Sequence, residues 1–317
     1  MDKKTGILLL NLGTPAAPDI IAVGKYLREF LSDPRVIELP AFLRWCLVNL
    51  CIVPFRTKRV AHAYAAIWQV DGSPLLINTQ KIQSELQKVV AANCTVVFGM
   101  RYGQPNIAQA LQTLQQQNID HIIVMPLFPQ YSAAVTGSAL AEVLRVLSLN
   151  KNIPACTLWD DFFDHPAYIK AMVKSIQPYL HAKYDYVLFS YHGLPKKQAV
   201  VGKHCYRSKC LQTATLIAQE LALSPRQWGI SFQSRLGKLE WLKPYTDDML
   251  VTLRQQDIDN LLVVCPSFIV DCLETLEEIG IRAAGQWRSL GGASLQLIPC
   301  LNAQPYWIAA LQEILAV

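Results

Sequence analysis

The chain has 317 residues, a net charge of +5, 52% apolar residues and 17% charged residues. This length suits two domains better than one hydrophobic core, and the apolar content excludes global disorder. The mild positive charge lacks the dense basic stripes of nucleic-acid-binding proteins, but it fits an anionic small substrate or an anionic membrane surface. We therefore expect a folded two-domain protein that does not bind nucleic acid.

The start of the chain and its cysteines indicate a cellular compartment. No basic and then apolar leader precedes the first strand-like run, and no apolar run reaches the roughly 18 residues that span a bilayer. The nine cysteines are an odd number without C-x-x-C spacing, which favours reduced thiols over a disulfide framework. We expect a cytoplasmic protein.

Short apolar runs predict strands, and the segments between them have the spacing of amphipathic helices. The strand-like runs are residues 7–10, 95–98, 122–125, 186–189, 230–232 and 261–264, and the helical segments include 79–91, 106–117, 168–180 and 210–221. Strands that are apolar on both faces and alternate with helices indicate parallel sheets covered by helices.

The two halves of the chain repeat similar motifs in the same order. Residues 10–15 parallel 190–195, an F-x-x-R-x-G run at 98–103 parallels one at 232–237, and 119–126 parallel 258–266. This order predicts two similar α/β lobes that arose by duplication. Gly13 to Gly103 spans 90 positions and Gly193 to Gly237 spans 44. We assign the difference of 46 to an insertion within residues 35–80.

The predicted insertion contains an apolar stretch and a basic cluster. Residues 42–55 are apolar except for Arg44 and Asn49, which fits either a buried helix or a lip that faces a membrane. Residues 56–59 (RTKR) follow directly. They form either a solvated basic helix face or a clamp for substrate carboxylates, which arginine binds well.

His192 follows an apolar strand-like run, at the strand end where α/β sheets bind ligands. An imidazole there can accept a proton near neutral pH or bind a borderline metal, and the alternative is a histidine that only stabilises a turn. In a helix, Asp271, Glu274 and Glu278 would share one face. They are either a solvated acidic turn or a carboxylate set that, with one imidazole, receives a divalent cation such as Fe²⁺.

Sequence motifs for nucleotide binding, phosphoryl transfer and serine hydrolysis are absent. The segments above instead resemble ferrochelatase, the terminal enzyme of haem synthesis, nearly from end to end. The motifs that carry the resemblance are residues 7–15 (ILLLNLGTP), 128–132 (FPQYS), 190–195 (SYHGLP), 231–237 (SFQSRLG), 240–242 (EWL), 271–278 (DCLETLEE) and 298–302 (IPCLN).

The resemblance implies an α/β fold of two similar doubly wound, Rossmann-like lobes of the chelatase type, each a parallel sheet flanked by helices. The expected divisions are an N-terminal lobe at 1–160 with the insertion at about 35–80, a C-terminal lobe at 161–303, and a terminal helix at 304–317. The second lobe would hold the metal-site residues, and the terminal helix would pack back on the first lobe. The porphyrin is expected in the cleft between the lobes.

The resemblance also implies roles for individual residues. His192 and Glu274 match the family's catalytic and metal-binding pair, and Glu278 is a candidate metal relay. The residues expected to bind the porphyrin are Arg56, Tyr64, Ser73, Arg101, Tyr102 and Tyr131.

Two departures from the family bear on metals. Some relatives carry another acidic residue where this chain has Arg282, which argues against an outer metal site. Animal enzymes hold an iron–sulfur cluster on a C-terminal cysteine extension that this chain lacks, and Cys205 and Cys210 alone do not supply four thiolates. We therefore expect no prosthetic group, with Fe²⁺ as a substrate.

The expected activity is insertion of Fe²⁺ into protoporphyrin IX to form protohaem. The alternatives are a chelatase for coproporphyrin III, sirohydrochlorin or another metal, and a non-catalytic porphyrin- or haem-binding protein. The expected partners are porphyrin and ferrous iron, with peripheral membrane contact left open. Either a monomer or a homodimer is compatible with the sequence.

Overall fold

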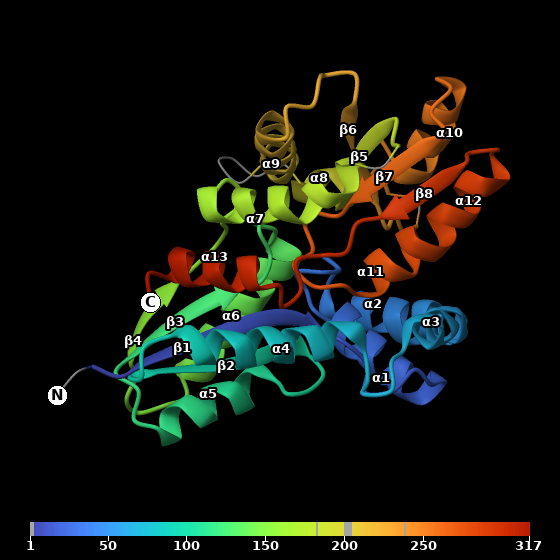
Figure 1. The fold of residues 1–317 in the computed structure, drawn as a ribbon. Coiled ribbons are helices and arrows are strands. Elements are labelled where there is room, and N and C mark those ends of the chain that lie inside the picture. Colours follow the sequence, from blue (N-terminus) through green and yellow to red (C-terminus); the bar gives the residue numbers. More distant parts are fainter. Residues whose placement is uncertain (1–2, 182, 200–204, 238) are drawn as a thin grey trace. The chain divides into compact units, whose positions relative to one another are not determined.

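The computed structural model describes residues 3–181, 183–199, 205–237 and 239–317 (Figure 1). Contacts within the chain divide it into two compact units. Unit 1 holds Met1–Asp161 and Leu315–Val317, and unit 2 holds Phe162–Ile314. Each unit is described by itself below.

Unit 1 is built on a four-stranded parallel sheet with the strand order β2-β1-β3-β4. The strands are β1 (Thr5–Gly13), β2 (Cys94–Tyr102), β3 (His121–Pro126) and β4 (Ala155–Leu158). Both faces of the central strand β1 are covered, and its residues 7–10 have no exposed surface. This double coverage explains why the strand is continuously apolar.

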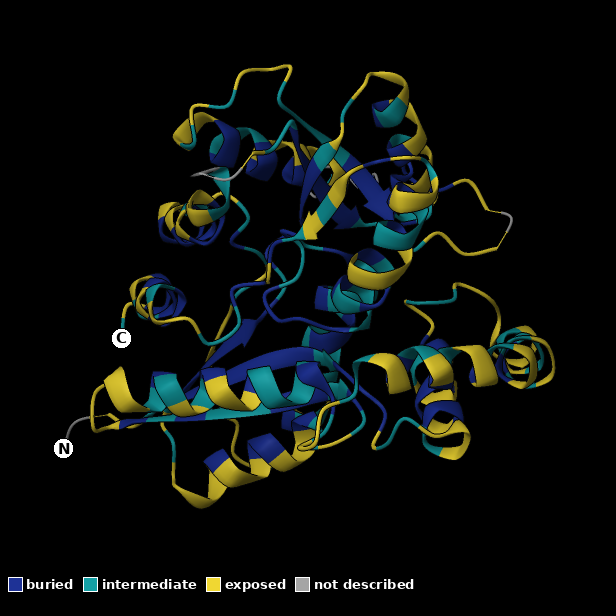
Figure 2. Ribbon diagram, turned by 45° about the vertical axis from the view of Figure 1, so that its right-hand side comes forward, coloured by how far each residue is buried: buried dark blue, intermediate teal, exposed yellow. Residues whose placement is uncertain are grey.

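The helices described in unit 1 are α1 (Ile20–Leu31), α2 (Ala41–Cys46), α3 (Val53–Ile67), α4 (Pro74–Val89), α5 (Ile107–Gln116) and α6 (Ser138–Leu147), with π-helical segments at Leu47–Ile52 and Ala133–Gly137. Of these, α1, α4, α5 and α6 contact the strands, whereas α3 packs on α1 and α2 has no buried residue. Leu111 and Leu114 of α5 and Val143 of α6 pack with Leu8 and Val124 of the strands. Figure 2 shows these helices buried on the side that faces the strands and exposed on the other.

Unit 2 repeats the arrangement with the strand order β6-β5-β7-β8, again all parallel. The strands are β5 (Tyr186–His192), β6 (Trp228–Gln233), β7 (Asn260–Val264) and β8 (Ser294–Leu297). The helices are α7 (Pro166–Ile176), α8 (Lys196–Ala199), α9 (Tyr206–Glu220), α10 (Thr246–Gln255), α11 (Leu273–Leu276), α12 (Ala284–Ser289) and α13 (Pro305–Leu315), with a 3₁₀ segment at Gln177–His181 and a π-helix at Glu278–Ala283. Leu250, Leu253 and Trp287 pack beneath β5 and β7.

The two units match in detail as well as in strand order. The backbone N–H of Met100 in β2 donates to the carbonyl of Pro105 at 2.7 Å, and that of Phe232 in β6 donates to Pro244 at 2.8 Å. These contacts lie at equivalent places in the two sheets, because Met100 pairs with Asn11 of β1 and Phe232 pairs with Tyr191 of β5. The predicted fold class, two similar doubly wound lobes of parallel strands flanked by helices, is confirmed.

The units differ in what connects their first two strands. Unit 1 places α1 to α4 between β1 and β2, whereas the described residues between β5 and β6 form α8 and α9. The α2 to α3 segment falls within residues 35–80, where the spacing of motifs places the insertion. Helix α13 up to Ile314 groups with unit 2, and packing of the terminal helix on the first lobe stays a prediction. Within unit 2, Trp307 stacks on Phe162 with a centroid distance of 6.0 Å.

Candidate active site

His192 is the last residue of β5, at the carboxyl end of the central strand of unit 2. Its ring Nδ1 lies 2.7 Å from the carbonyl oxygen of Gly193. Because a carbonyl only accepts hydrogen bonds, Nδ1 carries the proton in this contact. The other ring nitrogen, Nε2, is then the basic one, and it is free of a proton when the ring is neutral. The half-buried imidazole can therefore accept a proton or bind a metal through Nε2.

The backbone around His192 is held from three sides. Its N–H donates to Ser267 Oγ at 3.1 Å, and its carbonyl accepts from the Tyr206 hydroxyl at 3.0 Å. The N–H of Gly193 donates to the carbonyl of Gln233 in β6 at 2.8 Å. A Cβ atom on Gly193 would lie only 2.6 Å from that carbonyl oxygen, so the turn after His192 needs glycine.

Glu274 lies in α11, and one buried side chain ties this helix to the strand of His192. Gln233 Nε2 donates to the carbonyl oxygen of Glu274 at 2.7 Å. Gln233 Oε1 accepts from Ser190 Oγ at 2.8 Å, two residues before His192 in β5. The predicted pair of His192 and Glu274 thus belongs to one hydrogen-bonded region of unit 2, although 82 positions of sequence separate them.

Glu278 is held at the same end of the sheet by β6. Its two carboxylate oxygens accept from the backbone N–H and the hydroxyl of Ser234, at 2.8 and 2.6 Å. Arg282 Nε donates to Glu277 at 2.8 Å, and Arg282 Nη2 lies 3.9 Å from Glu278. Arg282 therefore neutralises part of the acidic segment.

The predicted carboxylate face on a single helix differs from the structure. Asp271 precedes α11, because Cys272 is the N-cap of that helix, and Glu278 already begins a π-helix. Asp271 is also buried and bonded to Thr275 and Asn302. In the described part of the chain, no three His, Cys, Asp or Glu side chains are grouped as a metal site.

Arg101 and Tyr102, predicted to bind the porphyrin, lie at the end of β2 in unit 1 and share one carboxylate. Asp33 accepts from Arg101 Nη2 at 2.7 Å, from the Tyr102 hydroxyl at 2.9 Å and from Ser138 Oγ at 2.5 Å. Burial works to raise the pKa of Asp33, but the hydrogen bonds of Ser138, Arg35 and Tyr102 and the charge of Arg101 together hold it below its ordinary value. Burial raises the pKa of Tyr102, so its hydroxyl stays protonated.

The other predicted porphyrin contacts of unit 1 lie in or near the insertion. Tyr64 in α3 is buried edge-on against Tyr26, with a centroid distance of 6.5 Å. Ser73 is buried and caps α4 by accepting from the N–H of Leu76 at 3.2 Å. Arg56 is half-buried, and its pKa is lowered by that burial and by nearby Arg59. Of these, the Arg56 side chain has the most exposed surface for a ligand.

Tyr131 lies between β3 and the π-helical segment Ala133–Gly137, and it is half-buried. A Cβ atom on Gly137 would lie 3.0 Å from the Tyr131 hydroxyl. The close approach of this backbone holds the tyrosine ring against the start of α6. Tyr131 therefore belongs to the same carboxyl end of the unit 1 sheet as Arg101 and Tyr102.

The insertion exposes large apolar side chains. On α2, the adjacent π-helix and α3, these are Phe42, Leu43, Trp45, Leu50 and Phe55, of which Phe42 is 74% and Phe55 80% exposed. We call these five residues the apolar lip. No helix within the described residues is long and apolar enough to cross a bilayer.

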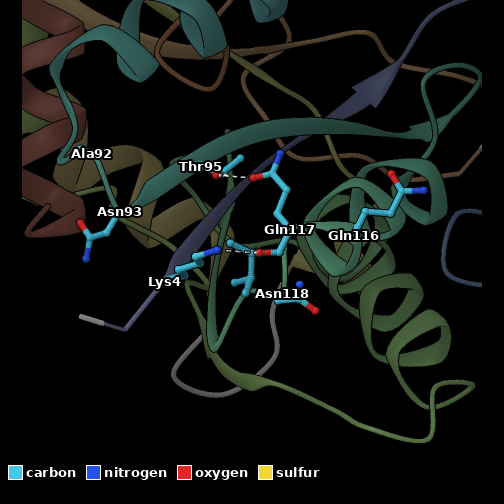
Figure 3. A pocket seen from close by; sticks show the side chains of 8 residues that line it. Lys4, Ala92, Asn93, Thr95, Gln116, Gln117 and Asn118 are labelled. Atoms are coloured by element: carbon cyan, nitrogen blue, oxygen red, sulfur yellow. Dashed lines mark hydrogen bonds between the residues drawn. The ribbon is translucent and has the colours of Figure 1, made fainter. Parts of the chain in front are cut away.

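A polar hollow of about 380 Å³ lies at the other end of the unit 1 sheet (Figure 3). Its lining includes Lys4 before β1, Thr95 at the start of β2 and Gln117 after α5. Thr95 Oγ1 donates to Gln117 Oε1 at 2.6 Å. This hollow contains none of the predicted site residues, which in unit 1 lie at the carboxyl ends of the strands or in the insertion.

Comparison with known proteins identifies the family. The family model named Ferrochelatase matches residues 4–316. The chain belongs to the ferrochelatase family. The ferrochelatase of Coxiella burnetii (strain Dugway 5J108-111) is 46% identical, covering 98% of this chain and 93% of that protein. That of Legionella pneumophila (strain Lens) is 46% identical and covers 98% of both. The chain is thus a porphyrin metal-chelating enzyme of the lyase class, with porphyrin and iron as substrates.

Solved structures support the same fold for this ferrochelatase family member. SirB from Bacillus subtilis with Fe³⁺ superposes with a TM-score of 0.59 at 13% identity, covering 99% of this chain and 94% of that one. CbiX, described as the terminal enzyme of sirohaem biosynthesis in denitrifying bacteria, superposes with a TM-score of 0.51 at 12% identity, covering 99% and 98%. At these identities the likeness concerns the fold alone.

Three residues important to the geometry of this ferrochelatase were not singled out from its sequence. Asp33 holds Arg101 and Tyr102, Gln233 ties α11 to β5, and Ser234 holds Glu278. Gln233, the last residue of β6, and Ser234 stand inside the 231–237 motif, just before Arg235. An uncharged pair at a strand end was the available signal for them, whereas Asp33 gave none, because its side-chain partners are about 70 or more positions away.

Proposed function

We propose that this enzyme inserts Fe²⁺ into protoporphyrin IX to form protohaem, with His192 and Glu274 as its catalytic residues. The observation that carries the proposal is the fixed tautomer of His192 beside the tethered helix of Glu274. The contact with Gly193 leaves Nε2 as the basic nitrogen, and Gln233 ties α11 to the same strand end. Family membership supports the substrate class.

The chemistry requires two pyrrole N–H groups to lose their protons while the iron loses water. Each departing proton leaves its electron pair on nitrogen, and the two nitrogens then bind Fe²⁺. His192 Nε2 would accept these protons one at a time, because its single lone pair holds one proton and an imidazole is a base that works near neutral pH. Glu274 would receive a proton or present the metal, and Glu278, held by Ser234, would act behind it as a relay.

Residues of unit 1 would bind the edge of the porphyrin. Arg56 is charged, half-buried and suited to a propionate, since a guanidinium pairs with a carboxylate through two hydrogen bonds. Tyr64 and Ser73 are buried and would support the porphyrin-binding surface from beneath it. Tyr102 would act in the same way, with its hydroxyl held by Asp33, while Arg101 and Tyr131 keep partly exposed side chains.

The proposed setting is the cytoplasm, with peripheral contact to a membrane through the apolar lip. A porphyrin is apolar over most of its faces, so exposed aromatic residues beside a basic helix suit its transfer from a bilayer. Flotation with vesicles that contain anionic lipid, comparing the natural chain with a Phe42→Ser/Phe55→Ser double variant, tests the contact. Loss of flotation in the variant is expected, and equal flotation would contradict it.

We propose that the enzyme holds no prosthetic group. Cys205 is half-buried at the start of α9 and Cys210 is buried within it, and all nine cysteines are free. Purified protein should lack the visible absorbance of an iron–sulfur cluster, and such absorbance with matching iron and sulfide would contradict the proposal. Light scattering on the same sample separates the monomer from the homodimer.

The deciding experiment mixes the enzyme with Fe²⁺ and either protoporphyrin IX or coproporphyrin III. We expect iron-dependent loss of porphyrin fluorescence with turnover, faster with protoporphyrin IX. Faster turnover of coproporphyrin III would replace the proposed substrate by the alternative one. Porphyrin binding without turnover for either substrate would indicate a non-catalytic binding protein.

A further inference from the structure

The segment after β8, which the resemblance includes as residues 298–302, has no role in the chemistry above. Its last residue, Asn302, makes three hydrogen bonds to the loop before α11. The Asn302 N–H donates to Ile269 at 2.8 Å, its Oδ1 accepts from the N–H of Asp271 at 2.9 Å, and its Nδ2 donates to Asp271 Oδ2 at 2.6 Å. One asparagine thus binds this loop through its backbone and both ends of its amide.

Hydrogen bonds of Asp271 connect this loop to the helix of Glu274. Asp271 Oδ1 accepts from the Thr275 hydroxyl at 3.1 Å and from the N–H of Cys300 at 3.3 Å. The same Thr275 oxygen accepts from the N–H of Cys272, the N-cap of α11, at 3.0 Å. Thr275 is fully buried and directly follows Glu274. The path from Asn302 to Glu274 therefore runs through part-buried hydrogen bonds to Asp271, a buried one from Thr275 to Asp271, and the peptide bond between Thr275 and Glu274.

We propose that Asn302 is a positioning residue that fixes the Glu274 carboxylate through Asp271 and Thr275. The inference rests on the proposed role of Glu274 and deepens it. It assigns Asp271 to the support of α11 and removes it from the iron donors. Both oxygens of Asp271 already accept hydrogen bonds, and the residue is 7% exposed.

Asparagine suits this position for two reasons. Its φ of +46° is in the left-handed region, which asparagine tolerates better than most residues. Its amide also offers one acceptor and one donor, which match the N–H and the carboxylate of Asp271. Aspartate at 302 would keep the acceptor but would place a second carboxylate against Asp271.

A reciprocal exchange tests the proposal. Asn302→Asp places two carboxylates face to face, and Asp271→Asn places two NH₂ groups face to face. The double variant Asn302→Asp/Asp271→Asn can remake every side-chain hydrogen bond named above, with the negative charge moved from position 271 to position 302. We expect each single variant to lose roughly 10–100-fold in kcat/KM for Fe²⁺, as is usual for supports of metal-binding side chains. The double variant should recover most of the loss.

The control uses the same chemistry at the opposite end of β7. Asn260 Nδ2 donates to Asp185 Oδ2 at 3.2 Å, where the strand begins. Asn260→Asp should lower the melting temperature and leave kcat/KM for Fe²⁺ within about twofold. Porphyrin affinity, from fluorescence quenching, should stay within about twofold in every variant, because the proposed effect concerns iron.

Two outcomes overturn the proposal. If Asn302→Asp affects turnover no more than Asn260→Asp does, Asn302 has a structural role only. If the double variant folds but stays as inactive as Asp271→Asn, the charge at position 271 is itself required. Asn302→Gly, which accepts the positive φ and adds no charge, replaces Asn302→Asp should that variant not fold.

A readout without turnover separates this inference from the proposed function. Amide hydrogen exchange at residues 274–277 should rise in Asn302→Asp and return in the double variant, since the restraint is local. Unchanged exchange in Asn302→Asp contradicts the positioning claim even if the enzyme metallates porphyrin. Absence of metallation by the natural chain contradicts the proposed function, and the exchange data still decide the restraint.

Discussion

The carboxyl ends of the two sheets share a scaffold but hold different side chains. By the strand register, Leu12 of β1 stands where β5 has His192, and Arg101 of β2 stands where β6 has Gln233. Arg101 binds Asp33 and Ser138 within unit 1, whereas Gln233 bonds to Ser190 and to the carbonyl oxygen of Glu274 in α11. The imidazole and its supporting amide therefore belong to unit 2 alone.

The arginines of the repeated motif show the same contrast. Arg101 reaches inward to Asp33, whose side chain is 4% exposed. Arg235 lies over the ring of Tyr245 and pairs with Asp247, whose side chain is 52% exposed. One copy thus joins a buried carboxylate, and the other makes a surface contact. The two units share a backbone arrangement, while the partner of each side chain determines what it does.

The largest difference in stability should be between variants of Asp33 and of Asp247, the partners of the two motif arginines. Asp33→Ala would leave Arg101 without its carboxylate and should lower the free energy of unfolding by about 3–5 kcal/mol, as for a broken buried ion pair. Asp247→Ala removes an exposed partner and should cost no more than about 1 kcal/mol. Urea unfolding followed by circular dichroism measures both. Equal losses would refute the contrast between the buried Asp33 and the exposed Asp247.

Smaller and selective effects should come from the buried amide side chains Gln233 in unit 2 and Asn11 in unit 1. Gln233→Ala removes the tie between β5 and α11 and should lower kcat/KM for Fe²⁺ roughly 10–100-fold. Asn11→Ala removes the bond from Asn11 Nδ2 to Thr79 Oγ1, which is 3.0 Å long in unit 1. It should cost about 1–3 kcal/mol of stability with little change in iron kinetics. Similar kinetic losses in both variants would show that the tie is not specific to the site.

The smallest effect concerns pH. The folded pKa of Asp33 lies below its ordinary value of 3.8, so its ionised form adds stability above that value, and this is lost as the pH falls through the lowered folded pKa. Asp33→Asn should therefore be less stable than the natural chain at neutral pH, and the gap should narrow in strong acid. Urea unfolding at a series of pH values measures it. A gap that widens on acidification would contradict the assignment.

Sequence alone predicted the fold because its main signals are local. Strands apolar on both faces, alternating with helices and repeating the F-x-x-R-x-G motif, are readable within a few tens of residues. His192 was identifiable for the same reason, since the strand before it and the glycine after it are adjacent in the chain.

The parts of the site that could not be predicted depend on partners that lie far away in the chain. The carboxylate face of Asp271, Glu274 and Glu278 assumed one continuous α-helix, but Asn302 and Thr275 hold Asp271 outside it. Likewise, Tyr102 was predicted to bind the porphyrin, whereas its hydroxyl in the structure donates a hydrogen bond to Asp33, 69 positions away. Hydrogen bonds between residues so far apart in the chain produce no periodic pattern in the sequence.

Iron insertion by His192→Ala, with Leu12→Ala as its counterpart from unit 1, tests the central claim most directly. Both changes shorten a side chain at the same place in the repeated fold, and only one removes a base. With protoporphyrin IX bound, kcat should fall about 10²–10⁴-fold in His192→Ala and change little in Leu12→Ala. Metallation by a folded His192→Ala protein at the natural rate would contradict the account.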